Sequence, residues 1–320
     1  MRSHLVELQA SLSRLVIALG VGALAALALG ACGDDDTKPG SPTPPPSESS
    51  PEATRGSGGD DTKPGTLTLK ATDFAFELEG APKPGVVRVV MPNEGKYVHQ
   101  AQFFRVDGDH TAAELIATIG PLIRAGKSLP GWVTWWGGPG ALAPGETAEH
   151  YIDFDEGRYI VLCFQGDPDG VPHLQKGQLA EVTFEGNRSG ASLPSAKVEI
   201  TGKDDGQGKS YAFGLPPSIA AGDTMVSFRN EGTEPHEMQL VRLSGDLALE
   251  KVVDVFLKKA APPAGFNSGL LGGPQVIMPG ESTRMRIDFK PGQYVFICPV
   301  PGPGGVSHAG LGMAARVEVK

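Results

Sequence analysis

Several features that would mark a familiar function are missing from this chain of 320 residues. No run of Lys and Arg with interleaved aromatic residues occurs and the formal net charge is -9, which excludes nucleic acid as an expected partner. The chain has no Ser, His and Asp grouping with hydrolase spacing, and no phosphate-binding glycine loop between a strand and a helix. Aromatic residues make up only 7% of the chain, whereas Gly (44) and Pro (28) are abundant. That balance favours short strands joined by turns, so we expect an all-β protein.

One long hydrophobic run occurs, from Leu15 to Leu29, and it follows Arg2 and Arg14. At about 15 residues the run is shorter than the roughly 20 that span a membrane, so cleavage as a secretory signal is favoured over spanning. Small residues then lead into Cys32, a pattern that resembles the lipobox of bacterial lipoproteins. We expect a signal peptide over residues 1–32 and lipidation of Cys32. The alternative is an ordinary signal peptide with a chance cysteine.

The next segment, residues 33–65, has no large apolar residue and is rich in Asp, Ser, Thr, Pro and Gly. Such a composition cannot bury a core, so we predict a disordered linker. A near-repeat of Gly-Asp-Asp-Thr-Lys-Pro-Gly within it indicates a duplicated spacer. The linker would hold the folded part away from the membrane.

The rest of the chain contains an internal repeat. Residues 85–105 align with residues 222–242 without a gap, and a later block aligns at a second constant offset. The positions that match are, in pairs, Asn93 and Asn230, Glu94 and Glu231, Gly95 and Gly232, His99 and His236, Gln102 and Gln239, Arg105 and Arg242, Gly137 and Gly272, Pro144 and Pro279, Asp153 and Asp288, Tyr159 and Tyr294, and Cys163 and Cys298. We infer that one domain was duplicated.

Within each repeat, Asn-Glu-Gly and Pro-Gly-Glu turns separate short apolar runs, a spacing that suggests a β-sandwich. Each repeat also holds one stretch with helical periodicity after the His strand. In the first repeat, Thr111 and Glu114 form a predicted capping box. The apolar positions of the two helices are Leu115, Ile116, Ile119 and Ile123, and Leu249, Val252, Val253, Phe256 and Leu257.

Chemistry-bearing residues recur at matched positions. Each Cys ends a Gly-x-Tyr-x-x-x-Cys strand, a His follows after nine residues, and a Gln or Met follows after four more. With the earlier His, the two sets are His99, Cys163, His173 and Gln178, and His236, Cys298, His308 and Met313. Two imidazoles, one thiolate and a weak Met or Gln ligand suit copper that cycles between two oxidation states.

These residues resemble the cupredoxins, the blue-copper fold of plastocyanin and azurin. The resemblance covers residues 66–187 and 194–320, with a linker at 188–193. It implies two tandem Greek-key β-sandwiches, each with one helical insertion, and one copper per domain, held by the two sets above. The set with Met313 is the closer match.

The sequence departs from the blue-copper pattern in two ways. The loop from the Cys to the second His is longer, and Gln100 or Glu237 stands where an Asn usually bridges the ligand loops. Cys163 and Cys298 could alternatively form one disulfide between the domains.

Three functions remain open on the sequence. The leading interpretation is a membrane-anchored, extracytoplasmic copper protein for electron transfer or copper handling, with a redox or copper-transfer protein as partner. A copper oxidoreductase is the second, but neither Cys lies in the His-Cys-His tripeptide that links oxidase centres. A metal-free binding or structural module is the third.

Three Trp residues, at 132, 135 and 136, are matched in the second repeat only by Phe266, Leu270 and Leu271. We expect them to pack beneath the helical insertion. The alternative is a docking face for a redox partner or a sugar.

Overall fold

The computed structural model describes residues 61–264 and 266–320, all of which belong to one compact unit. The predicted signal peptide, Cys32 and most of the predicted linker lie outside the described residues. Within the described part, no helix is long and apolar enough to cross a membrane.

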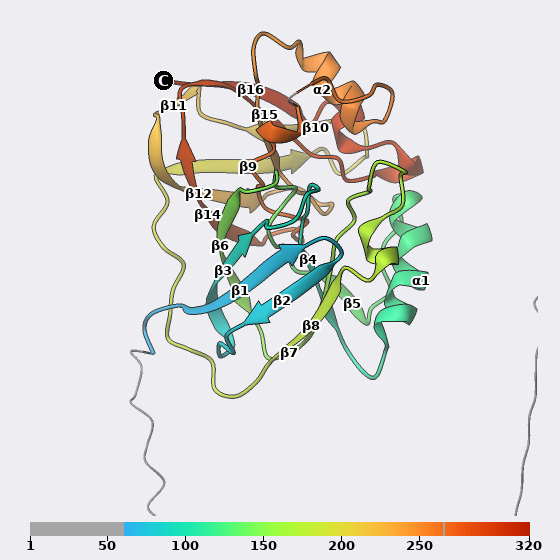
Figure 1. Ribbon diagram of the computed structural model, residues 1–320, viewed down its shortest axis with the longest axis vertical. Helices are drawn as coiled ribbons and strands as arrows, with labels where there is room; N and C mark the ends of the chain where they lie inside the picture. Colours follow the sequence, from blue (N-terminus) through green and yellow to red (C-terminus); the bar gives the residue numbers. More distant parts are fainter. Residues whose placement is uncertain (1–60, 265) are drawn as a thin grey trace, which may run out of the picture. The chain divides into compact units, whose positions relative to one another are not determined.

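Strands dominate both repeats, as the composition predicts (Figure 1). The first repeat contains β1 (Gly65–Thr72), β2 (Ala75–Glu79), β3 (Gly85–Pro92), β4 (Gln102–Val106), β5 (Val133–Trp135), β6 (Thr147–Phe154), β7 (Gly157–Leu162) and β8 (Leu179–Phe184). The second contains β9 (Val198–Asp204), β10 (Tyr211–Gly214), β11 (Ser218–Ile219), β12 (Gly222–Asn230), β13 (Gln239–Arg242), β14 (Ser282–Phe289), β15 (Gly292–Ile297) and β16 (Ala314–Val319). The helices are α1 (Ala112–Arg124) and α2 (Leu249–Phe256), with short 3-10 turns at η1 (His173–Lys176), η2 (Asn267–Gly269), η3 (Pro303–Gly305) and η4 (His308–Leu311).

The strands form three sheets. One eight-stranded sheet has the order β10-β9-β12-β14-β6-β3-β1-β2 and runs through both repeats. The repeats meet in it where β14 pairs with β6, with Met285 opposite His150. Two four-stranded sheets, β5-β4-β7-β8 and β11-β16-β15-β13, complete one sandwich in each repeat.

Each sandwich buries its own core between its two sheets. Along β3, the side chains of Val87, Val89 and Met91 are fully buried, and they pack against Tyr159 and Val161 of β7. This alternation is the pattern expected of strands with one face on a core. Each fully buried side chain of this size contributes about 1.5 to 3 kcal/mol through the hydrophobic effect.

Both predicted helices are present. The predicted capping box starts α1, since Thr111 and Glu114 bond reciprocally across its first turn. Leu115 and Ile119 pack on the outer face of the β5-β4-β7-β8 sheet, and Trp132 and Trp135 lie in the same cluster. These two Trp residues therefore pack beside the helix, as predicted, whereas for Trp136 the prediction is wrong, because its ring packs against the core between the sheets. Helix α2 covers the matching sheet of the second repeat.

Two glutamines join the repeats by reciprocal hydrogen bonds. The Gln239 amide donates to the Ala141 carbonyl at 2.9 Å and accepts from the Ala141 N–H at 2.8 Å. The matched Gln102 does the same with Val276, at 3.3 and 2.9 Å. Such mutual contacts between equivalent patches are the signature of a twofold-symmetric interface. The two repeats are therefore packed like the subunits of a dimer.

We predict that Gln239→Met weakens this interface. The substitution leaves the buried Ala141 N–H without its acceptor, which costs about 1 to 3 kcal/mol of unfolding free energy, while the Ala141 carbonyl keeps its bond from the Gly272 N–H at 2.8 Å. Urea denaturation of the full chain measures the loss. Gln207→Met, at an exposed position, serves as the control and should change stability by less than about 0.5 kcal/mol. Equal stabilities of the two variants would contradict the assigned role of Gln239.

His150 makes the fold sensitive to acid. Its side chain is buried and its Nδ1 has no hydrogen-bond partner among the described residues, and burial lowers its pKa to about 3. An unfolded imidazole has a pKa of about 6.5, so the unfolded state binds more protons and stability falls as the pH drops from 6.5 towards 3.

We therefore expect His150→Met, which copies Met285 of the second repeat, to reduce the loss of stability between pH 7 and pH 4.5. The reduction should be about 2 to 3 kcal/mol, because pH 4.5 lies two units below the unfolded pKa. Denaturant titrations at both pH values measure it, with the partly exposed His110→Met as control. The same acid sensitivity in wild type and His150→Met would refute this explanation.

Candidate metal centres

In the first repeat, two imidazoles and a thiol converge in the buried interior. His99 Nδ1 and His173 Nδ1 lie 3.1 Å apart, and Cys163 Sγ lies 4.0 and 3.6 Å from them. All three side chains have no exposed surface. The structure thus brings together three of the four residues predicted from the sequence.

The second repeat repeats this arrangement. His236 Nδ1 and His308 Nδ1 are 3.1 Å apart, and Cys298 Sγ lies 3.5 Å from His308 Nδ1. The three ligand-type atoms of each group lie within 4.8 Å of one another. Both cysteines are free and each is buried in its own repeat, so the alternative of a disulfide between them is wrong.

The Asn-Glu-Gly turn positions the first His. Asn93 folds the turn through its side chain, which accepts from the Gly95 N–H and donates to the carbonyls of Tyr97 and Leu142. Asn230 makes the equivalent three bonds in the second repeat. The Asn side chain therefore holds the turn in one conformation next to the site, which explains why Asn recurs in both copies.

The glycine of the same turn makes room for a carboxylate behind the His. A Cβ on Gly232 would lie 2.6 Å from His236 Nε2 and 2.1 Å from Asp204 Oδ2. In the space left free, Asp204 Oδ2 approaches His236 Nε2 at 3.0 Å, and Asp73 approaches His99 Nε2 at 3.2 Å. Any larger residue at the glycine would separate the imidazole from its carboxylate.

These carboxylates orient the imidazoles. A proton on Nε2 that is donated to Asp leaves the Nδ1 lone pair directed at the thiol, the arrangement in which a carboxylate supports a metal-binding His. Burial would raise the pKa of Asp204, but hydrogen bonds from Thr233, Glu234 and Gly206 together lower it to about 2. Asp204 is therefore ionised and can accept.

The long loop between Cys and second His closes as a hairpin. In the first repeat Gly166 bridges Pro172, and in the second Pro301 bridges Ser307. The His308 N–H then donates to the Val300 carbonyl at 2.8 Å, which places the ring at the start of η4. The extra length therefore does not separate the second imidazole from the sulfur.

The fourth predicted residue lies next to each group. Met313 is fully buried in one apolar cluster with Cys298 and Tyr211. Gln178 is fully buried as well, and its Nε2 donates to the Thr72 carbonyl at 3.1 Å. Its Oε1 has no hydrogen-bond partner among the described residues. A buried amide oxygen without a partner is costly unless something else occupies its lone pairs.

The two groups differ in what holds the second His. In the second repeat, His308 Nε2 lies 3.2 Å from Glu234 Oε2, and Tyr211 stacks on the ring at 4.1 Å while donating to the other Glu234 oxygen. In the first repeat, the matched position is Tyr97, which offers no carboxylate.

Aromatic contacts surround His173 instead. Phe74 and Tyr97 lie 5.0 and 5.9 Å from its ring, and Phe74 adopts a left-handed φ of 76°, which is rare for a bulky residue. His173 Nε2 is buried with no hydrogen-bond partner among the described residues. On its Nε2 side, the second imidazole of the first repeat is thus held by packing and not by a carboxylate.

The protonation states leave lone pairs free on the imidazoles. Burial, reinforced by the neighbouring His236, lowers the pKa of His308 to about 3, and burial also lowers the pKa of His99, His173 and His236. All four rings are therefore neutral at pH 7. Burial raises the pKa of Cys163 to about 12 and raises that of Cys298 as well, so each sulfur carries a proton until a cation displaces it.

The spacing of the three atoms fits one small metal ion. First-row ions bond imidazole nitrogen at about 2.0 Å and thiolate sulfur at about 2.3 Å, so trigonal ligands lie roughly 3.5 to 3.7 Å apart. The distances within the first group run from 3.1 to 4.0 Å, and the three atoms of the second group lie within 4.8 Å of one another. In the second repeat both Nε2 atoms face carboxylates, so two Nδ1 lone pairs meet in a dry interior, an arrangement that a cation stabilises.

Gln100 stands where the blue-copper pattern has a bridging Asn, and it bonds both the Cys loop and the other repeat. Its Oε1 accepts from Gln165 Nε2 on the Cys loop, and its Nε2 donates to Gln275 Oε1 of the other repeat at 2.7 Å. The matched Glu237 is buried, which raises its pKa to about 8, so at neutral pH it is mostly the uncharged acid and resembles Gln in shape.

Sequence reasoning missed Asp73, Asp204 and Glu234. The signal was present, since an Asp follows the first strand of each repeat, but residues 205–210 interrupt the alignment directly after Asp204. Tyr97 and Glu234 occupy matched positions with different chemistry, so comparing the repeats could not single out Glu234.

Comparison with known proteins gives only structural likenesses. No protein-family model and no curated protein matches the chain. Solved structures that resemble it include a reduced auracyanin from the photosynthetic bacterium Roseiflexus castenholzii, at 24% identity over 39% of this chain and 99% of that chain, with a TM-score of 0.27. Another is an azurin from Methylomonas sp. strain J, at 18% identity over 39% and 99%, with a TM-score of 0.26. A third is a copper-containing nitrite reductase from Thermus scotoductus SA-01, at 14% identity over 80% and 61%, with a TM-score of 0.24.

Each repeat is a cupredoxin-like β-sandwich. In each repeat two sheets form the sandwich, and a buried His-Cys-His group lies within it. The predicted fold class is therefore confirmed.

We predict that Asp204→Asn lowers the metal affinity of the second centre by about 10- to 100-fold, because the amide accepts more weakly from His236 and no longer supplies charge. Competition titration with a chromophoric chelator measures this. Asp205→Asn, in the same loop but bonded only to exposed backbone, is the matched control. If both variants bind metal alike, the carboxylate does not support the imidazole.

Proposed function

We propose that this chain is a two-centre copper protein that acts in electron transfer or copper handling. One centre comprises His99, Cys163, His173 and Gln178, and the other comprises His236, Cys298, His308 and Met313. The observation that carries the proposal is the convergence, in both repeats, of two neutral imidazoles and one thiol in a water-excluded interior.

The donor set selects among metals. One thiolate favours soft ions and two imidazoles suit copper in either oxidation state, whereas hard ions such as magnesium and calcium require oxygen ligands. Bound copper would supply a one-electron redox step. The residues of the chain hold the imidazoles in fixed tautomers, exclude water, and release the thiol proton when the ion enters.

The two centres would differ in how well their imidazoles are oriented before the metal binds. In the second, Glu234 and Asp204 hold both imidazoles through their Nε2 atoms, whereas in the first only His99 has a carboxylate. Imidazoles that are already oriented need less reorganisation to bind. We therefore propose that the second centre takes up copper first.

The N-terminal sequence supports a location outside the cytoplasm. A lipidated Cys32 after a cleaved signal peptide would anchor the chain outside the cytoplasm, and the linker of residues 33–65 would separate the sandwiches from the membrane. We propose that a redox or copper-transfer protein meets the copper centres there.

Copper loading of the full chain tests the proposal. We expect one copper per repeat, with intense visible absorption and an electron paramagnetic resonance spectrum that reports thiolate ligation. Cys298→Ser and Cys163→Ser should each remove one equivalent, and the double variant should remove both. His110→Ala, a His outside both groups, should bind as the wild type does.

Two outcomes would reject this function. A chain that takes up no copper at micromolar concentration is a metal-free sandwich protein. Uptake that survives the double Cys variant unchanged places copper elsewhere.

A further inference from the structure

The two repeats differ at one place in the groove where they meet. Trp136 of the first repeat matches Leu271 of the second, directly before the Gly-Gly-Pro segments of the interface. The three residues that contact Trp136 are identical at the matched positions of the second repeat, so the setting of Trp136 indicates what the matched place can hold.

Trp136 fills its side of the groove through three contacts. Its indole Nε1 donates to the Asp153 carbonyl at 2.9 Å, its ring meets Tyr159 edge-on at 5.4 Å, and the Arg105 guanidinium lies 5.8 Å from the ring. The space left on this side measures about 120 Å³.

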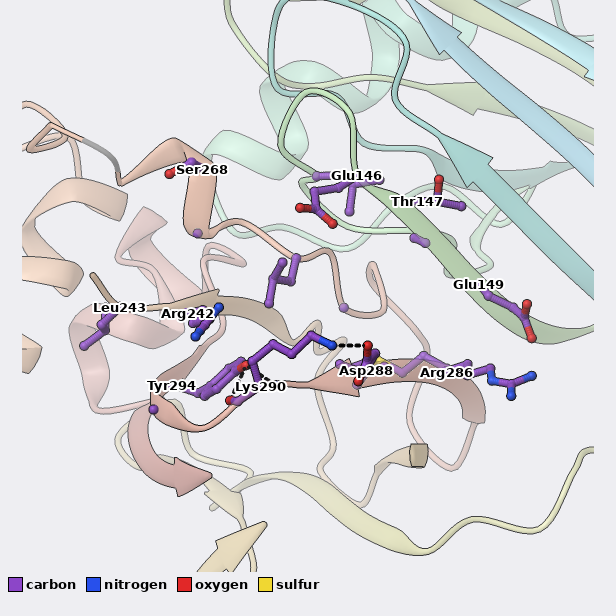
Figure 2. A pocket seen from close by; sticks show the side chains of 18 of the residues that line it. Glu146, Thr147, Glu149, Arg242, Leu243, Ser268, Arg286, Asp288, Lys290 and Tyr294 are labelled. Carbon is purple, nitrogen blue, oxygen red and sulfur yellow. Dashed lines mark hydrogen bonds and ion pairs between the residues drawn. The ribbon is translucent and has the colours of Figure 1, made fainter. Parts of the chain in front are cut away.

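The same three partners surround a cavity in the second repeat. Asp288, Tyr294 and Arg242 match the contacts of Trp136, and Leu271 is too short to replace the indole. The cavity measures about 630 Å³, within the range of small-molecule sites. In Figure 2, Arg242, Lys290 and Tyr294 lie on one side of it and Glu146, Thr147 and Glu149 on the other.

The charge beside the ring position has also changed. In the first repeat, Arg105 is paired with Asp107 at 3.2 Å and Asp155 at 3.3 Å. Ser244 and Lys290 stand at these two positions in the second repeat. Within residues 61–264 and 266–320, no carboxylate lies within ion-pair distance of Arg242, which bonds only the Pro291 carbonyl at 3.2 Å. Two carboxylates have thus been replaced by a hydroxyl and a second cation.

The other charges of the cavity are mostly balanced. Arg286 pairs with Asp223, Glu149 pairs with Arg88, and Lys290 pairs with Asp288. Glu146 lies on the opposite wall, on the Pro-Gly-Glu turn. Among the residues that the structure describes, Arg242 is thus a cation of this cavity without a carboxylate partner.

We propose that this cavity binds a small aromatic carboxylate. The ring takes the place that the indole of Trp136 occupies in the first repeat, against Tyr294 and the apolar Leu271. The carboxylate takes the role of Asp107 and Asp155 as the partner of Arg242, and Lys290, which already pairs with Asp288, adds a second positive charge nearby. The carboxylate of such a ligand would form charge-assisted hydrogen bonds with Arg242, and its aromatic ring would lie close to the same cation. The site is separate from both copper centres and does not depend on them.

Titration calorimetry of the full chain with indole-3-acetate tests the proposal, since this probe combines the indole of Trp136 with a carboxylate. We expect saturable binding at one site, and binding at least about tenfold weaker for neutral indole, which lacks the charge-assisted bonds. Acetate, which lacks the ring, should not compete at equal concentration.

Leu271→Trp is the decisive variant, because it installs the residue that fills the groove in the first repeat. It should abolish binding of both indole-3-acetate and indole. Unchanged circular dichroism and copper uptake would show that the variant is folded. Ser244→Asp with Lys290→Asp restores the charges of the first repeat, and should abolish the preference for the acid while indole still binds.

Three outcomes would overturn the proposal. One is the absence of saturable binding to the wild type at millimolar probe, which makes the cavity a solvent-filled gap. Another is equal binding to the wild type and a folded Leu271→Trp. The third is a preference for the acid that survives the double aspartate variant.

Discussion

The reciprocal hydrogen bonding of Gln102 and Gln239 is the constraint on which the rest of the structure depends. Each amide saturates backbone groups of the opposite repeat, and both side chains are buried, so the repeats cannot slide without leaving polar groups unpaired. The interface also reaches the copper centres. Leu142 exchanges two backbone bonds with His99 and bridges Leu271 of the other repeat, so the segment that joins the repeats also positions a metal-site His.

Much of the site could be predicted because duplication acts as an internal control. Cys163 and Cys298, with a His at the same spacing after each, identify the groups without any structure, and the capping box at Thr111 fixed the start of α1. The supporting carboxylates were beyond reach for a physical reason. Asp204 ends a strand that lies far from His236 in sequence, and the parallel pairing of β9 with β12 brings this end beside the turn before His236, where the two side chains lie 3.0 Å apart. The pairing of β14 with β6 was equally hidden, since polar and apolar residues alternate on both strands as they do on strands at the edge of a sheet.

The surroundings of the two centres have diverged in opposing ways. If both centres bind copper as proposed, Met313 is a softer donor than Gln178 and would favour the reduced ion, whereas the carboxylate of Glu234 beside His308 would favour the more positive, oxidised ion. In the first repeat the combination is reversed, because Gln178 offers a hard oxygen while Phe74 and Tyr97 enclose His173 in apolar surface. Each centre therefore combines one group that would favour the reduced ion with one that would favour the oxidised ion. The redox balance between the two depends on all four surrounding groups, and not on the axial residue alone.

The same divergence explains why one half of the groove is filled and the other is open. An indole removed from a packed interface forfeits its dispersion contacts and leaves a void, a change that ordinarily costs stability unless the walls collapse. The walls here are fixed, because the Gly272 carbonyl accepts from Gln239, the Gly273 carbonyl accepts from the Gly140 N–H of the other repeat, and β14 pairs with β6 and β12. A rigid interface with Leu271 in place of an indole therefore keeps a cavity of the size that an indole fills. In the first repeat two aspartates neutralise Arg105, whereas Ser244 and Lys290 at the matched positions leave Arg242 able to bind an anion.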